Sequence, residues 1–138
     1  MKFKIAVVIV LSVISTLTTV GATPSSKDRP ITHITLRTES DGDHRHFVGV
    51  GGTIDGKVNP DLFVKAWDVV EITLINNDGL KHHIGLPDFF ITSHEVMEKG
   101  AKTVVTFVPF KSGGFTYNCI LDNHKEMGMK GGLIIRNR

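Results

Sequence analysis

The stretch GGFTYNCILDNHKEMGMKGG, residues 113–132, contains the only cysteine of the chain, Cys119. His124 follows it by five residues, and Met129 follows His124 by five more. Thiolate, imidazole and thioether groups are the soft to borderline donors that copper prefers, and a trigonal His₂Cys site with a weak axial Met is one known copper geometry. The stretch therefore predicts three donors of a mononuclear copper site, which needs one more histidine.

The residues before this cysteine alternate as in a strand, where every second side chain lies on the same face. Phe115, Tyr117 and Cys119 then share one face, and the two aromatic residues indicate that this face is buried. A buried thiol is inert when it is only structural, but it becomes a ligand when other donors converge on it. A coordinated metal ion would deprotonate the thiol and leave a soft S⁻ donor.

The missing histidine is His82 or His83, which follow a strand and a turn. The same alternation distinguishes the two. His82 would share a face with the apolar Ile84 and Leu86, whereas His83 would share one with Gly85. Because the apolar face is the inner one, His82 is the better candidate, and His83 is the alternative.

Alternation elsewhere predicts seven or eight short strands separated by turns, without a long helix. The clearest strand is 68–77, where Val70, Ile72 and Leu74 alternate with polar residues before a turn at 76–79. We expect the other strands at 31–37, 47–50, 62–64, 82–86, 102–108, 115–119 and 133–136, a polar loop at 38–45, and a short helix or loop near 93–97. This pattern is typical of an all-β sandwich or barrel.

The first 22 residues differ from the rest, because two lysines precede an apolar run at 5–20 and small residues follow it. This is the pattern of a secretory signal peptide, and the run is shorter than the ~20 apolar residues of a membrane span. We therefore expect a signal peptide at 1–22, a flexible leader at 23–30 and a single domain at 31–138, exported and without a membrane span after cleavage.

Charge and cysteine content narrow the possible partners. Removing the two lysines of the signal peptide lowers Lys+Arg from 16 to 14, which equals the 14 acidic residues, so the net charge falls from +2 to 0. A neutral chain argues against a nucleic-acid partner. A single cysteine excludes an intrachain disulfide, and an unpaired cysteine in an exported chain favours a ligating or reactive thiol.

Together these motifs resemble those of the cupredoxins, the small type 1 blue copper proteins, over residues 46–138. The shared features are Cys119-x4-His124-x4-Met129, a histidine after a turn, and GGFxYxC at the cysteine. The chain is similar to auracyanin, azurin and plastocyanin, and to the first cupredoxin domain of copper nitrite reductases. The resemblance implies a Greek-key β-sandwich that binds one copper ion per chain through His82, Cys119, His124 and Met129.

The resemblance also bears on two ambiguous positions. In the family, the axial methionine of sites with this spacing stands directly before Lys-Gly or Val-Gly, as Met129 does here, so Met129 is favoured and Met127 is the alternative. The first histidine ligand is usually followed by a polar residue, often Asn, that joins the two ligand loops. Here that residue is His83.

The implied function is that of an electron carrier. The resemblance implies a protein that passes single electrons between redox proteins such as cytochromes or copper oxidoreductases. With the signal peptide, we expect it to work as a monomer in the periplasm or an equivalent extracytoplasmic compartment. Electrons would pass at His124, with Leu80, Met127 and Gly128 at the rim of an apolar patch.

Two alternatives remain, namely an accessory domain or subunit of a copper oxidoreductase related to nitrite reductase, and a copper carrier. Catalysis of the nitrite reductase kind is not expected. Those enzymes bind a second copper with histidines at two positions that are Asn118 and Pro87 here.

A second group of polar residues could serve a weak metal site. His44 and His46 lie near Asp41 and Asp43. We interpret this group as part of a solvated polar loop. The two remaining histidines, His33 and His94, are expected at the surface.

Overall fold

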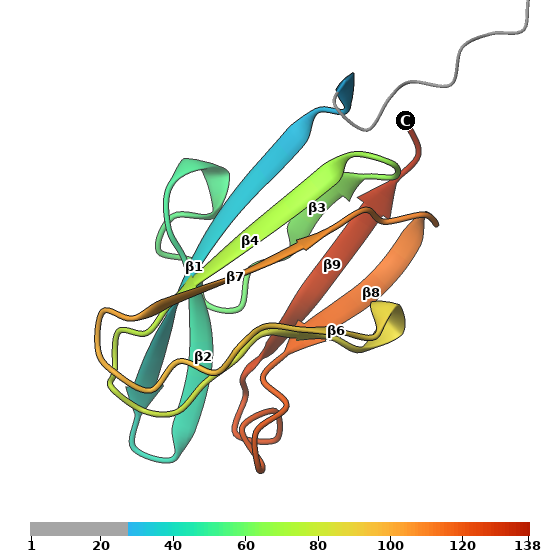
Figure 1. Cartoon of the computed structure of the whole chain (residues 1–138). Coiled ribbons are helices and arrows are strands. Elements are labelled where there is room, and N and C mark those ends of the chain that lie inside the picture. Colours follow the sequence, from blue (N-terminus) through green and yellow to red (C-terminus); the bar gives the residue numbers. More distant parts are fainter. Residues whose placement is uncertain (1–27) are drawn as a thin grey trace, which may run out of the picture.

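The computed structural model describes residues 28–138, and two β-sheets form the framework of this part of the chain (Figure 1). The predicted signal peptide, 1–22, and most of the predicted leader, 23–30, lie outside the described residues. Within residues 28–138, no helix is long and apolar enough to cross a membrane.

Each sheet contains strands from distant parts of the sequence. The first sheet has the order β2-β1-β4-β7 and consists of β1 (Ile31–Asp41), β2 (His44–Gly49), β4 (Val69–Ile75) and β7 (Lys102–Phe107). The second has the order β3-β9-β8-β5-β6 and consists of β3 (Leu62–Lys65), β5 (Gly85–Leu86), β6 (Ile91–Thr92), β8 (Gly113–Asn118) and β9 (Lys130–Arg136). The chain crosses repeatedly between the sheets, and the predicted β-sandwich is confirmed.

The core lies between the sheets and follows the predicted alternation. Val70, Ile72 and Leu74 of β4 are fully buried. In β7, Thr103, Val105 and Phe107 are buried, and the side chains that alternate with them are exposed. Burying one face of each sheet against the other provides the main stabilisation of such a sandwich.

The predicted polar loop at 38–45 is wrong, because these residues extend β1 and start β2. Thr38 pairs with Phe47 and Asp41 pairs with His44 in an antiparallel hairpin. The turn is made by Gly42, whose φ of 56° suits glycine. The two turn residues are Gly42 and Asp43, and a Gly-Asp pair is a hairpin signal even between polar residues. Exposed side chains are tolerated at the edge of a sheet.

The region after the histidine pair is less regular than expected. The predicted strand at 82–86 is reduced to β5, and a single 3₁₀ turn, η3 (Pro87–Phe89), follows it. No helix forms at the described residues 93–97. There the chain is extended, and Val96 exchanges two backbone hydrogen bonds with His82, at 2.9 and 2.8 Å. A second 3₁₀ turn is η2 (Gly52–Ile54).

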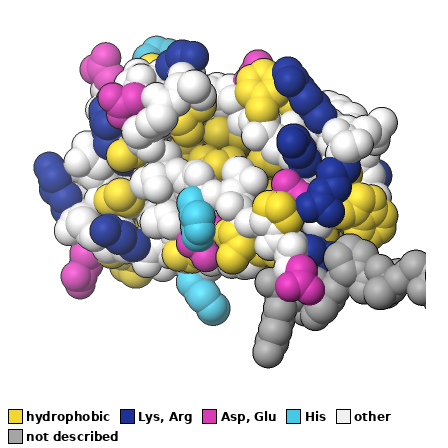
Figure 2. Space-filling model, turned by 90° about the horizontal axis from the view of Figure 1, so that it is seen from above, with side chains coloured by type: hydrophobic (Ala, Val, Ile, Leu, Met, Phe, Trp, Pro, Cys, Tyr) yellow, Lys and Arg dark blue, Asp and Glu magenta, His cyan; other side chains and the backbone are white. Residues whose placement is uncertain are grey.

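The two ends of the sandwich carry different parts of the chain. The β8–β9 loop and the β1–β2 hairpin lie at one end, while the C-terminus and the first described residues lie at the other (Figure 1). Figure 2 views this second end, where acidic and basic side chains are interspersed among hydrophobic ones. The end with the β8–β9 loop carries the residues predicted to bind metal.

Candidate metal centre

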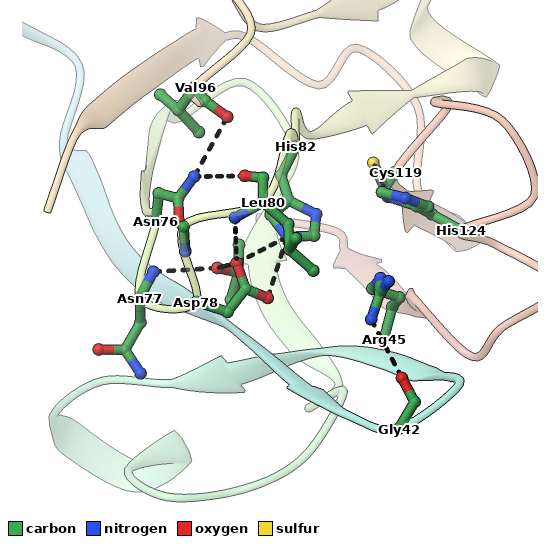
Figure 3. A network of polar contacts seen from close by, with 12 residues as sticks. Gly42, Arg45, Asn76, Asn77, Asp78, Leu80, His82, Val96, Cys119 and His124 are labelled. Atoms are coloured by element: carbon green, nitrogen blue, oxygen red, sulfur yellow. Dashed lines mark hydrogen bonds and ion pairs between the residues drawn. The ribbon is translucent and has the colours of Figure 1, made fainter. Parts of the chain in front are cut away.

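Three of the predicted donors converge. One ligand atom each from His82, Cys119 and His124 lies within 4.8 Å of the other two. The Cys119 Sγ is 3.5 Å from Nδ1 of His124, and the ring centroids of His82 and His124 are 5.1 Å apart. Among residues 28–138 this is the only such group of His, Cys, Asp and Glu side chains. It joins the segment before β5 to the segment after β8 (Figure 3).

The backbone of the β8–β9 loop holds its donor residues together. The Cys119 N–H donates to the Met129 carbonyl at 3.1 Å, and the Met129 N–H donates to the His124 carbonyl at 2.9 Å. The side chain of Met129 is fully buried, whereas Met127 is partly exposed. This difference favours Met129 as the fourth donor, and the assignment stays a prediction.

A glycine allows the two ligand segments to approach each other. Gly85 of β5 pairs with Asn118 of β8, directly before Cys119. A Cβ atom at position 85 would lie 2.9 Å from Cγ2 of Ile120, closer than side chains normally approach. The absence of a side chain at Gly85 therefore lets His82 and Cys119 share one site.

The structure brings His82, and not His83, into the group. His82 is fully buried, as are Ile84 and Leu86 on the same predicted face. Its Nδ1 is buried and has no hydrogen-bond partner within the described part of the chain. This nitrogen is on the side of Cys119 and His124 (Figure 3). A buried ring nitrogen without a hydrogen-bond partner, beside a thiol and a second imidazole, fits a bound metal ion.

His83 contributes through its backbone instead of its side chain. The backbone N–H groups of His83 and Leu121 hydrogen-bond the sulfur of Cys119. Burial raises the pKa of the Cys119 thiol, and these two hydrogen bonds oppose that rise. The connection between the ligand loops, expected from a polar side chain at position 83, is therefore made by a main-chain group. Such hydrogen bonds to a ligating sulfur influence the properties of a metal site.

Both imidazoles are poised to be neutral ligands. Burial lowers the pKa of His82, and the opposing attraction of Asp78 does not reverse the shift. Burial also lowers the pKa of His124, and the Arg45 guanidinium adds to the effect. Metal binding requires neutral imidazole. One thiolate and two imidazoles, together with the predicted thioether of Met129, would form a donor set that suits copper.

Two charged residues of the site were not predicted. The Asp78 carboxylate lies against Nε2 of His82, with its oxygens at 2.9 and 3.0 Å. Arg45 of β2 extends toward the group from the hairpin, and its Nε is buried without a hydrogen-bond partner among residues 28–138 (Figure 3). The sequence predicted only a turn at 76–79, which contains Asp78, and only a polar loop at 38–45, which contains Arg45. Neither pattern indicates that these residues lie beside the donors.

The turn at 76–79 is held by its own side chains. The amide of Asn76 donates to the carbonyls of Leu80 and Val96, and its Oδ1 accepts from the Gly79 N–H at 2.8 Å. Gly79 has a φ of 76°, which favours glycine. This network fixes the segment that leads into His82.

The side chains of the second polar group are not gathered into a possible metal-binding cluster within residues 28–138. His44, Asp41 and Asp43 are exposed on the hairpin, and His46 lies 3.6 Å from Glu39. The interpretation as solvated polar residues is supported, although they belong to a hairpin and not to a loop. His33 and His94 are exposed, as predicted.

The predicted rim of the site is only partly apolar. Leu80 is 37% exposed, and Met127 and Gly128 are partly exposed. The last two residues line a shallow hollow together with polar residues of the β1–β2 hairpin, among them His44 and Arg45.

Comparison with known proteins finds copper proteins of similar structure. The chain is similar to rusticyanin from Thiobacillus ferrooxidans at 20% identity and a TM-score of 0.56, over 84% of this chain and 86% of that one. It is similar to an auracyanin from the photosynthetic bacterium Roseiflexus castenholzii at 16% identity and a TM-score of 0.57, over 76% and 97%.

A copper nitrite reductase from Nitrosomonas europaea also matches, at 23% identity and a TM-score of 0.56, over 78% of this chain but only 42% of that one. No protein-family model and no curated protein sequence matches the chain. At these identities the similarity shows the fold.

Proposed function

The chain has the cupredoxin fold, and we propose that it holds one type 1 copper ion and carries single electrons. The observation that carries this proposal is the buried, unpartnered Nδ1 of His82, which lies beside the thiol of Cys119 and the imidazole of His124. With Met129 as the axial donor, these residues supply a complete type 1 ligand set.

The frame around the ligands supports fast electron transfer. Bound copper would supply a one-electron Cu(I)/Cu(II) couple. The ligand segments are fixed by the Gly85–Asn118 pairing, by the bonds between Cys119 and Met129, and by the bonds between His82 and Val96. Ligands held by a stiff sandwich move little when the charge changes, so little reorganisation opposes the transfer.

The donor set also argues against catalysis. Four protein donors leave no open position for a substrate, unlike catalytic metal sites. Asn118 and Pro87 occupy the two positions at which nitrite reductases carry histidines for a second copper. The match to part of a nitrite reductase keeps an accessory domain or subunit of a copper oxidoreductase as the second candidate.

The site and the expected signal peptide indicate where electrons would enter and in which compartment the protein would work. His124 is partly exposed, so it is the group through which electrons would leave or enter. The partners would be redox proteins, a cytochrome or a copper oxidoreductase. With the expected signal peptide at 1–22, the protein would work as an exported monomer in the periplasm or an equivalent compartment.

The test is to add Cu(II) to the purified metal-free protein and record visible and electron-paramagnetic spectra. We expect an intense thiolate-to-copper band, absent in the Cys119→Ala variant and retained in His94→Ala, a matched change at an exposed histidine. Reversible one-electron cycling on an electrode would complete the result. A protein without this band would contradict the proposal. Rapid transfer of the copper to a Cu(I) chelator would indicate a copper carrier instead.

A further inference from the structure

The side chain of Asp78 makes the closest polar contact to the proposed ligand His82. Its two oxygens lie 2.9 and 3.0 Å from Nε2, the ring nitrogen on the far side from Cys119. The side chain of His82 is fully buried and that of Asp78 is 9% exposed. The pair is therefore shielded from water, where charges interact more strongly than at the surface.

Further hydrogen bonds fix the carboxylate in place. The Thr38 hydroxyl and the Leu80 N–H both donate to Oδ1 of Asp78, each at 3.1 Å. The Thr38 hydroxyl in turn accepts from the Asn77 N–H at 3.0 Å. Because Thr38 is fully buried in β1, Asp78 connects the ligand loop to the first sheet.

An ionised carboxylate accepts hydrogen bonds and cannot donate them. The Thr38 hydroxyl and the Leu80 N–H both donate to Oδ1 of Asp78, and two donors on one oxygen favour the ionised carboxylate. The proton of a neutral His82 must then lie on Nε2. Its Nδ1 keeps a free lone pair that faces the other donors.

The carboxylate also brings a negative charge within one imidazole of the metal position. A negative charge at this distance stabilises the more positive oxidation state, and partners of the ligands tune a metal site in this way. Arg45 provides the opposite charge on the hairpin side, since its guanidinium lowers the pKa of both His82 and His124.

We propose that Asp78 is a positioning residue for the metal centre: it holds His82 in the Nε2-protonated form and lowers the reduction potential of the bound copper. The second part rests on the proposed function. The first part concerns the protein without metal and can be tested separately.

The test of the first part uses ¹⁵N NMR of the histidine rings in the metal-free protein, with the full chain expressed and the product purified. We expect His82 protonated at Nε2 in the wild type and in Asp78→Asn, whose amide oxygen still accepts. In Asp78→Ala we expect a mixture of the two tautomers. A wild-type His82 protonated at Nδ1 would overturn the positioning role, whatever copper does.

The test of the second part is the reduction potential of the copper-loaded protein. We expect Asp78→Asn to lower the preference for Cu(II) over Cu(I) about tenfold. For a one-electron couple this change raises the reduction potential by about 59 mV. The matched control is Asp43→Asn, which removes an exposed carboxylate on the hairpin and should change the potential much less. Arg45→Gln should shift it in the opposite direction.

Equal potentials in Asp78→Asn and Asp43→Asn would overturn the electrostatic role. A protein that binds no copper would defeat the proposed function, while the NMR result would still decide the positioning role. If Asp78→Ala does not fold, Asp78→Asn and Arg45→Gln keep both parts testable.

Discussion

Asn59 connects the turn at 55–60 to the ligand loop, and replacing it tests how firmly that loop is held. Its Oδ1 accepts from the Phe47 N–H at 3.0 Å, and its Nδ2 donates to the Gly128 carbonyl at 2.8 Å. Gly128 directly precedes Met129. Asn59 also has a left-handed φ of 46°, a conformation that Asn tolerates better than most residues.

Asn59→Ala should lower the free energy of unfolding through two separate effects. Two hydrogen bonds are lost, at about 0.5–1.5 kcal/mol each. Alanine in the left-handed region adds about 1 kcal/mol of backbone strain. The free energy of unfolding should therefore fall by about 2–4 kcal/mol. Asn59→Gly loses the same bonds without the strain, so its loss should be about 1–3 kcal/mol.

The assay is urea denaturation of the metal-free protein, so the outcome does not depend on copper. The matched control is Asn77→Ala, since the Asn77 side chain is exposed and such surface changes usually stay within about 0.5 kcal/mol. We expect stability to decrease in the order wild type, Asn59→Gly, Asn59→Ala. A loss below about 0.5 kcal/mol in Asn59→Ala would refute the reasoning about the hydrogen bonds. A glycine variant no more stable than the alanine variant would refute the strain argument.

Two further predictions concern the ligand loop and the strand that follows it. In the copper-loaded protein, Met129→Leu should shift the visible spectrum and raise the reduction potential, whereas Met127→Leu should leave both nearly unchanged; the reverse result would make Met127 the axial ligand. Gly131→Ala should destabilise the protein by about 1–3 kcal/mol in urea denaturation, because its Cβ would overlap the buried ring of Tyr117. Gly114→Ala, which meets open space, is the matched control, and equal losses in the two variants would contradict this packing argument.

The features that were predicted from the sequence depend on short-range patterns. The spacing of Cys119, His124 and Met129 belongs to one loop, and strand alternation needs only neighbouring residues. Alternation also selected His82 over His83, and the structure places His82 in the donor group. The choice of His82 and the buried strand faces required only the position of a side chain relative to its own strand, which the period of two supplies.

The features that were missed depend on contacts between distant segments. The sequence cannot show that Thr38 reaches Asp78 across 40 residues, because that contact exists only once β1 and β4 pair in parallel. The wrong loop at 38–45 had the same cause. Its polar composition suggested solvent, but pairing with β2 carries Thr38 into the interior and directs Arg45 toward the site.

The donor atoms and the charges beside them come from different parts of the chain. The segment before β5 and the β8–β9 loop provide the donor atoms, whereas the β1–β2 hairpin contributes Arg45 and Thr38, which holds Asp78. The two charges act on the imidazoles from opposite sides and with opposite sign. Substitutions at Asp78 or Arg45 can therefore change the balance between the oxidation states while every donor is retained. The donor set would then determine which metal binds and the approximate reduction potential, and the two charges would adjust that potential.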